Sequence, residues 1–290
     1  ALPVEQGAAV IRYALKRGFN FLDTAQYYRT YPYIKKALEH EGFDDVVISS
    51  KSLCTDYDGM MEAVLEAREE LGRDVIDIFL MHELRSGQLE ERAGAWDALQ
   101  DARAKGLVRA IGLSTHHIDV TEAAASMPEL DVVFPLINYA GLGIRKGDAF
   151  GSKEEMLAAI RRCHRAGKGV FSMKAFGGGS LTSHYQEALV YVFSKEEIDS
   201  VMIGFGKNAE VDDLIAYLDG SMPKTYNPDV SKKRVYINQE DCEGCGACLK
   251  ICAAGAVHYN KNGLAEIDQS KCLTCGYCAQ GCPVRAIIMY

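Results

Sequence analysis

Eight of the ten cysteines in this 290-residue chain lie in its last fifth, in two runs of identical spacing. Each run is Cys-x2-Cys-x2-Cys-x3-Cys, and the second is followed by Pro283. Three thiolates separated by two residues each can surround one [4Fe-4S] cubane, whereas the fourth points to a neighbouring cluster. We therefore expect two clusters, one held by Cys242, Cys245, Cys248 and Cys282, and the other by Cys252, Cys272, Cys275 and Cys278.

Zinc is the alternative for such cysteines, because a structural zinc ion also takes four thiolates and Cys-x2-Cys pairs. Zinc sites use two separated pairs, however, and not close triplets repeated with a fourth member. The stretch from about Val235 to Tyr290 resembles the bacterial two-cluster ferredoxins, with Ala253 where their motif usually has proline. This resemblance implies a small α+β domain of two pseudo-symmetric halves that exchanges electrons.

Polar residues also follow short apolar stretches in the first three quarters of the chain. Barrel enzymes keep their chemistry at the carboxyl ends of their strands. Each motif alone has a plainer explanation, since an aspartate often caps a turn and a single histidine more often makes a structural contact. Together and in this order they favour a catalytic site: Asp23 to Tyr28, Ser50-Lys51, Met81-His82 and Gly112-Leu113-Ser114.

Helical and strand patterns alternate between these motifs. This alternation predicts a parallel sheet covered by helices, closed as a (β/α)8 TIM barrel, with an open doubly wound sheet as the alternative. Seven strands and a leading helix are predicted, so an ideal barrel needs one more strand upstream of Ala1, and we expect a missing N-terminus. The strands are expected at 20–23, 46–50, 76–81, 109–113, 131–134, 169–173 and 200–203, and the helices at 4–16, 33–40, 60–71, 92–105, 121–126, 153–166 and 210–218.

The segments GFNFLDTAQYY, VVISSKS, VIDIFLMH and KGLVRAIGLSTH resemble the aldo-keto reductase family, and the resemblance runs from about Val4 to Leu218. The family's catalytic tetrad of Asp, Tyr, Lys and His matches Asp23, Tyr28, Lys51 and His82. The resemblance implies that Tyr28 protonates the oxygen of a carbonyl that receives a hydride. We expect Lys51 to lower the Tyr28 pKa, Asp23 to keep Lys51 charged, and His82 to orient the substrate oxygen.

The same resemblance implies NADP(H) as cofactor. Ser114 corresponds to the residue that contacts the nicotinamide amide. The glycine run that includes Gly178 would let the backbone approach the pyrophosphate, and a helix N-terminus after the last strand is a further anion site. Phe134 replaces a glutamine of many relatives, and Met173 or Lys174 replaces a stacking aromatic. The candidate cofactor-binding residues at the anion site after the last strand are Gly204, Gly206, Lys207 and Asn208.

A formal charge of -8 and a pI near 5.5 argue against nucleic acid or anionic lipid as partners. The chain has no apolar run of the ~18 residues that span a bilayer and no basic-then-apolar leader, so we expect a cytoplasmic protein without a membrane partner. A proline-containing stretch of mixed character separates the two parts. We therefore expect a barrel at 1–219, a linker at 220–233 and a ferredoxin domain at 234–290.

These features predict an oxidoreductase with a small carbonyl or alcohol substrate and an electron-transfer function in the clusters. Nicotinamide moves two electrons as hydride while each cubane moves one, so a flavin or a redox protein partner would normally link them. No flavin motif is present in the sequence. The alternative is an electron-transfer or assembly subunit whose barrel does not turn over.

Overall fold

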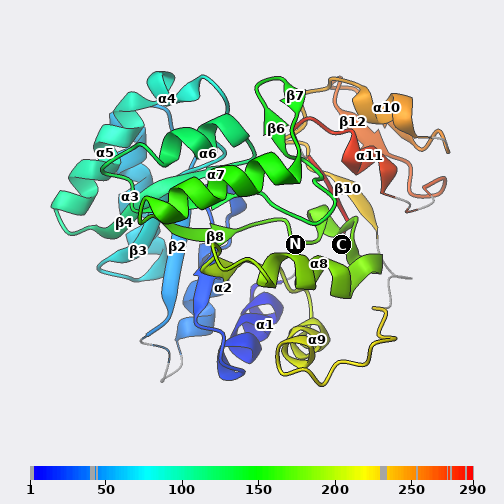
Figure 1. Cartoon of the computed structure of the whole chain (residues 1–290), viewed down its shortest axis with the longest axis horizontal. Coiled ribbons are helices and arrows are strands. Elements are labelled where there is room, and N and C mark those ends of the chain that lie inside the picture. Colours follow the sequence, from blue (N-terminus) through cyan, green and yellow to red (C-terminus); the bar gives the residue numbers. More distant parts are fainter. Residues whose placement is uncertain are drawn as a thin grey trace.

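The structure is a computed structural model of the chain, and it describes residues 3–39, 43, 45–228, 234–252, 254–272, 274, 276–284 and 286–289. One curved sheet of seven parallel strands forms its centre, in the order β1-β2-β3-β4-β5-β8-β9 (Figure 1). This arrangement confirms the predicted parallel α/β class. The strands are β1 (Phe21–Asp23), β2 (Val47–Ser52), β3 (Ile76–Met81), β4 (Val108–Thr115), β5 (Val132–Pro135), β8 (Gly169–Ser172) and β9 (Ser200–Val201).

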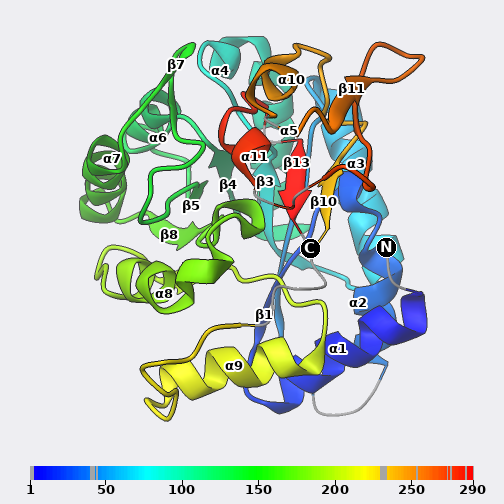
Figure 2. The same ribbon diagram turned by 90° about the vertical axis from the view of Figure 1, so that its right-hand side faces the viewer.

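Helices connect successive strands and lie outside the sheet, as Figure 2 shows from the side. Capping residues in the sequence fix where some of these helices begin. Ser152 and Glu155 form a reciprocal capping box at the start of α7. Asp56 accepts the Gly59 N–H at the start of α3. The helices are α1 (Val4–Lys16), α2 (Tyr31–Leu38), α3 (Tyr57–Leu71), α4 (Gln88–Glu91), α5 (Ala93–Ala104), α6 (Ile118–Ala124), α7 (Lys153–Arg165), α8 (Tyr185–Phe193) and α9 (Asn208–Leu218).

Two helices and one hairpin of the barrel were not predicted from the sequence. Helix α8 has the sequence YQEALVYVF, whose tyrosine, valine and phenylalanine residues also suit a strand. The short helix α4 has only four residues. Strands β6 (Arg145–Lys146) and β7 (Ala149–Phe150) form a two-stranded hairpin where the sequence predicts neither a strand nor a helix.

Large apolar side chains fill the inside of the curved sheet. Phe134 and Phe171 stack there with ring centroids 4.1 Å apart, next to the fully buried Leu80. Gly112 on β4 has no room for a side chain, since a Cβ would stand 1.8 Å from the Val132 carbonyl oxygen. Tight packing in this layer of side chains fixes the positions of the carboxyl ends of the strands.

The sheet is open between its first and last strands. Within the described residues, β1 and β9 form the two edges and do not pair with each other. A cleft of about 1050 Å³ lies between these edges and is lined by apolar residues of α1, α9 and both strands, among them Val10, Phe21, Ile203 and Leu214. Asp23 and Tyr28 also border this cleft.

The C-terminal part forms a separate small unit of helices and strands, here called the module. Strand β10 (Val235–Ile237) pairs with β13 (Ile287–Met289), and β11 (Val257–Tyr259) pairs with β12 (Ala265–Ile267), both antiparallel. Helices α10 (Ala247–Ile251) and α11 (Tyr277–Gln280) complete it. In Figure 1 and Figure 2 the orange and red module lies against the end of the barrel that carries the carboxyl ends of the strands.

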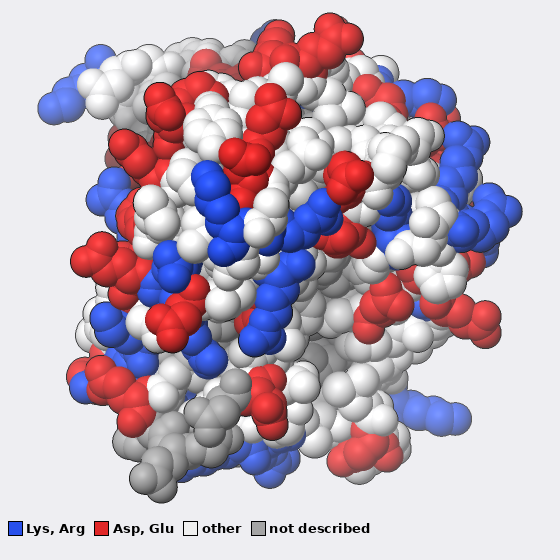
Figure 3. All heavy atoms as spheres, turned by 90° about the vertical axis from the view of Figure 1, so that its left-hand side faces the viewer, with Lys and Arg blue, Asp and Glu red and all other residues white. Residues whose placement is uncertain are grey.

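The surface carries charges of both signs. On the face drawn in Figure 3, basic and acidic side chains are interspersed, without a broad area of either sign. Within the described ranges, every helix is too short or too polar to cross a bilayer.

Candidate active site

Asp23 and Lys51 form a buried ion pair at the carboxyl ends of β1 and β2. The Lys51 Nζ lies 2.7 Å from Asp23 Oδ2 and also donates to the Thr24 carbonyl oxygen. Lys51 is only 1% exposed. Burial raises the Asp23 pKa and lowers the Lys51 pKa, and the attraction between the two charges opposes both shifts.

Tyr28 and His82 form the second pair of the site. Tyr28 lies in a short 3-10 helix after β1, and its hydroxyl is 3.4 Å from His82 Nε2, with the two rings edge to face. Burial, reinforced by the nearby positive charge of Lys51, lowers the His82 pKa to about 3. His82 is therefore neutral at physiological pH.

The expected lowering of the Tyr28 pKa by Lys51 stays a prediction, while other groups around the phenol raise this pKa. The Tyr28 pKa is raised, first by burial of the phenol and then by the negative charge of Asp23. Lys51 Nζ lies over the Tyr28 ring, 5.0 Å from its centroid, and donates its short hydrogen bonds to Asp23 and Thr24.

Further charged residues surround this group, and of these the sequence named only Lys174, as a possible replacement for the stacking aromatic. Glu83 and Lys174 both have positive φ angles, 47° and 63°, in a region that most non-glycine residues avoid. Lys174 contributes to the low pKa of His82, and burial raises the pKa of Glu83. Arg92, 3% exposed, donates to the carbonyl oxygens of His82, Ser52 and Cys54 and so ties the ends of β2 and β3 together.

Two predicted cofactor residues already have neighbours within the protein. Ser114 is fully buried, and its Oγ accepts the Glu83 N–H at 2.9 Å. Gly178 has φ 71° in the turn Gly177–Gly179, and a Cβ there would stand 3.8 Å from the carbonyl oxygen of Ile287 in the module. The module therefore lies against the predicted pyrophosphate loop.

The candidates after β9 lie on the surface at the start of α9. The Gly206 N–H donates to Glu210 Oε2 at 2.7 Å, so a carboxylate of the chain itself occupies part of this anion site. Gly204 faces open space. Lys207 and Asn208 are exposed at the helix N-terminus, where an adenosine phosphate could reach them.

The first predicted cysteine quartet surrounds one cavity of the module. Cys242, Cys245, Cys248 and Cys282 line it together with Glu243 and Ile287. Burial raises the Cys248 pKa to about 11, and the charge of Cys282 is the next cause, ahead of Cys242 and Cys245. The fourth cysteine of the second run thus lies beside the first triplet, in the interleaved order that a two-cluster module needs.

The second quartet is described in part, because Cys275, like Ala253, lies outside the described residues. Backbone N–H groups donate to the sulfurs of Cys252 and Cys272, from Ala256 at 3.3 Å and from Thr274 at 3.4 Å. Such donors stabilise cluster-bound thiolates. Cys252, Cys272 and Cys278 belong to one apolar cluster with Cys242, Cys248 and Cys282.

The first quartet therefore fits an iron-sulfur cluster in residue type and arrangement, and the described members of the second, Cys252, Cys272 and Cys278, fit one in residue type. In the described part of the chain, no three His, Cys, Asp or Glu side chains meet closely enough to hold one metal ion. A cubane does not require such a meeting, because each of its four thiolates binds a different iron atom.

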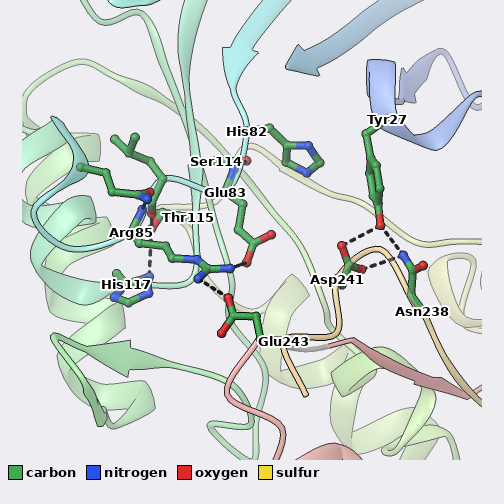
Figure 4. Close-up of polar contacts among 12 residues, drawn as sticks. Tyr27, His82, Glu83, Arg85, Ser114, Thr115, His117, Asn238, Asp241 and Glu243 are labelled. Carbon is green, nitrogen blue, oxygen red and sulfur yellow. Dashed lines mark hydrogen bonds and ion pairs between the residues drawn. The ribbon is translucent and has the colours of Figure 1, made fainter. Parts of the chain in front are cut away.

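Direct contacts join the module to the catalytic end of the barrel (Figure 4). The Tyr27 hydroxyl donates to Asp241 Oδ1 at 2.6 Å, and Asn238 Nδ2 donates to both the Tyr27 oxygen and Asp241. Arg85 binds Glu243 at 2.9 Å and lies 3.5 Å from Glu83. Asp241 and Glu243 are the sequence neighbours of Cys242, and Tyr27 is the sequence neighbour of Tyr28.

This fold and site define an oxidoreductase barrel joined to an iron-sulfur domain. Residues 1–196 match the family described as "Aldo/keto reductase family", and residues 233–283 match the "4Fe-4S dicluster domain". The chain belongs to the aldo/keto reductase family, with a C-terminal 4Fe-4S domain, as the resemblances predicted.

Individual relatives match one part of the chain or the other. Methylglyoxal reductase DkgA of Escherichia coli is 24% identical over 214 residues, which cover 70% of this chain and 74% of that protein. A component of the ion-translocating oxidoreductase complex of Methanosarcina acetivorans is 52% identical over 46 residues, 16% of this chain and only 17% of that protein. The fold resembles that of the Bombyx mori aldo-keto reductase AKR2E4 in complex with NADP, with 15% identity, a TM-score of 0.57 and coverage of 80% of this chain and 81% of that one.

Proposed function

We propose that this protein is an NAD(P)H-linked oxidoreductase that interconverts a small carbonyl compound and its alcohol. The observation that carries the proposal is the connected group of Asp23, Lys51, Tyr28 and His82, since it joins a proton donor to a neutral hydrogen-bonding imidazole and a buried ion pair. A bound nicotinamide would supply or accept the hydride.

Tyr28 is the proton donor in this proposal. Its phenol is protonated at physiological pH, so that a proton is available when the carbonyl oxygen becomes negative and is basic enough to take it. Neutral His82, next to the Tyr28 hydroxyl, orients the same oxygen by a hydrogen bond. The Lys51 charge at the base of the site favours the developing negative charge.

NADP(H) is the cofactor that we propose for the barrel. Lys207 and Asn208 are the residues best placed for the adenosine phosphate, because they are exposed at a helix N-terminus. Ser114 retains its hydroxyl proton as a donor for the nicotinamide amide. The contact between Gly178 and the module limits how the pyrophosphate can approach.

We propose that the module holds two [4Fe-4S] clusters on the eight cysteines and exchanges single electrons with a redox protein partner. The cavity lined by the first quartet supports this, as does the similarity to a component of an oxidoreductase complex. A second candidate is an electron-transfer subunit without barrel turnover, which the module's contact with the predicted pyrophosphate loop favours.

Steady-state reduction of a panel of aldehydes and quinones with NADPH tests the proposal. Tyr28→Phe should lower kcat/KM by about 10²-fold or more, because it removes the proton donor. Tyr57→Phe is the matched control, since it removes a tyrosine–aspartate hydrogen bond of 2.7 Å on the outer helices. Equal rates for wild type and Tyr28→Phe would refute the tetrad, and lack of NADPH binding would favour the electron-transfer subunit.

A further inference from the structure

The contacts between module and barrel come from a short segment around the first cluster ligand. Asp241 precedes Cys242 and accepts a 2.6 Å hydrogen bond from Tyr27. Glu243 follows Cys242 and binds Arg85 at 2.9 Å. Both flanks of this cysteine are therefore fixed to the barrel, as Figure 4 shows.

The same barrel residues lead directly to the tetrad. The rings of Tyr27 and Tyr28 lie 5.8 Å apart, and those of Tyr27 and His82 lie 6.4 Å apart. The charge of Asp241 is one of the causes that raise the Tyr28 pKa. An electrostatic change near Cys242 is thus felt at the catalytic tyrosine.

The walls of the first cavity also touch the barrel. Glu243 and Ile287 line the cavity of the first quartet, and each has a barrel neighbour, Arg85 and Gly178 respectively. Sulfurs of both quartets accept N–H groups from inside the module, Cys242 in the first and Cys252 and Cys272 in the second, so the contacts with the barrel are what distinguish the first quartet.

We propose that the two clusters have fixed places: the one on Cys242, Cys245, Cys248 and Cys282 is proximal to the barrel site, and the other is distal. Tyr27 and Arg85 are the residues that position the proximal cluster over the tetrad. This inference rests on the proposed assignment of the cysteines to two clusters. The distal cluster is then the one that meets a redox partner.

Redox titration of the anaerobically purified full chain, followed by electron paramagnetic resonance, tests this order. Arg85→Gln should lower the midpoint potential of one cluster, because Glu243 beside Cys242 loses its positive partner. Asp241→Asn should raise the potential of the same cluster, because it removes a negative charge from the other side of that cysteine. Two variants with shifts of opposite sign exclude a general loss of structure as the cause.

Two control variants show which cluster each shift in midpoint potential belongs to. Arg109→Gln removes an arginine–aspartate pair of 2.7 Å from the barrel surface and should shift neither potential. Lys271→Gln removes a positive charge next to Cys272 and should lower the potential of the other cluster.

The results of the redox titration distinguish a failure of the proximal assignment from a failure of the proposed function. If Arg85→Gln and Asp241→Asn shift neither cluster, or shift the one that Lys271→Gln shifts, the proximal assignment is overturned while the two clusters stand. If the wild-type chain gives no signals of two clusters, the proposed function itself fails.

Discussion

The buried pair of Asp23 and Lys51 makes its own prediction at the scale of single residues. Lys51→Met should destabilise the fold by about 3–5 kcal/mol, because it leaves the Asp23 carboxylate buried without its charged partner. The double variant Asp23→Asn/Lys51→Met should cost less than the sum of the single variants. Urea unfolding of the four proteins measures this coupling, and additive losses would show that the pair does not act as a unit.

His82 links the site to the pH dependence of stability. Its pKa is about 3 in the folded chain against an ordinary value of 6.5, so the unfolded chain takes up the proton first as the pH falls. Between pH 7 and pH 5 this histidine should lower the free energy of unfolding by about 2 kcal/mol.

Urea unfolding at the two pH values, with wild type and His82→Gln compared, checks this effect. The wild type should lose more stability than the variant on acidification. Parallel losses would mean that His82 titrates normally and is charged more readily than the structure indicates.

Residue types at strand ends predicted the members of this site, but not their orientations. Asp23 and Lys51 lie at the carboxyl ends of β1 and β2, and His82 follows β3, so the strand pattern predicted that they would lie together. The sequence did not reveal that burial and the Asp23 carboxylate raise the Tyr28 pKa, because both depend on how the side chains pack. The positive φ angles of Glu83 and Lys174 left no sequence signal, since such an angle has no periodic pattern.

At the scale of elements, Gly112 sets the contact between β4 and β5. Gly112→Ala should destabilise the barrel by about 1–3 kcal/mol or more, because its Cβ would collide with the Val132 carbonyl oxygen. Gly204→Ala is the matched control, since a Cβ there meets open space and should change stability by less than about 0.5 kcal/mol. Equal melting temperatures of both variants and wild type would show that the two strands can separate without cost.

The elements were predicted well where the spacing of apolar residues was clear. The ends of α1 and β3 match the sequence prediction residue for residue. Helix α8 was missed because tyrosine, valine and phenylalanine favour strands locally, while burial of Tyr185 and Leu189 stabilises the helix through packing.

At the scale of the whole molecule, the main result is the position of the module on the catalytic end of the barrel. The cysteine spacing predicted the module and its interleaved quartets, but nothing in the sequence indicated where the module docks. That position depends on pairs far apart in the chain, Tyr27 with Asp241 and Arg85 with Glu243. Single hydrogen bonds of this kind have no signal in a lone sequence.

The central claim is that one chain joins a reductase barrel to two iron-sulfur clusters. Iron and acid-labile sulfide, measured per chain in anaerobically purified protein, test it most directly. We predict about eight iron atoms and about eight sulfides, four of each per cubane. About four of each would contradict the second cluster, and zinc in place of iron would contradict both.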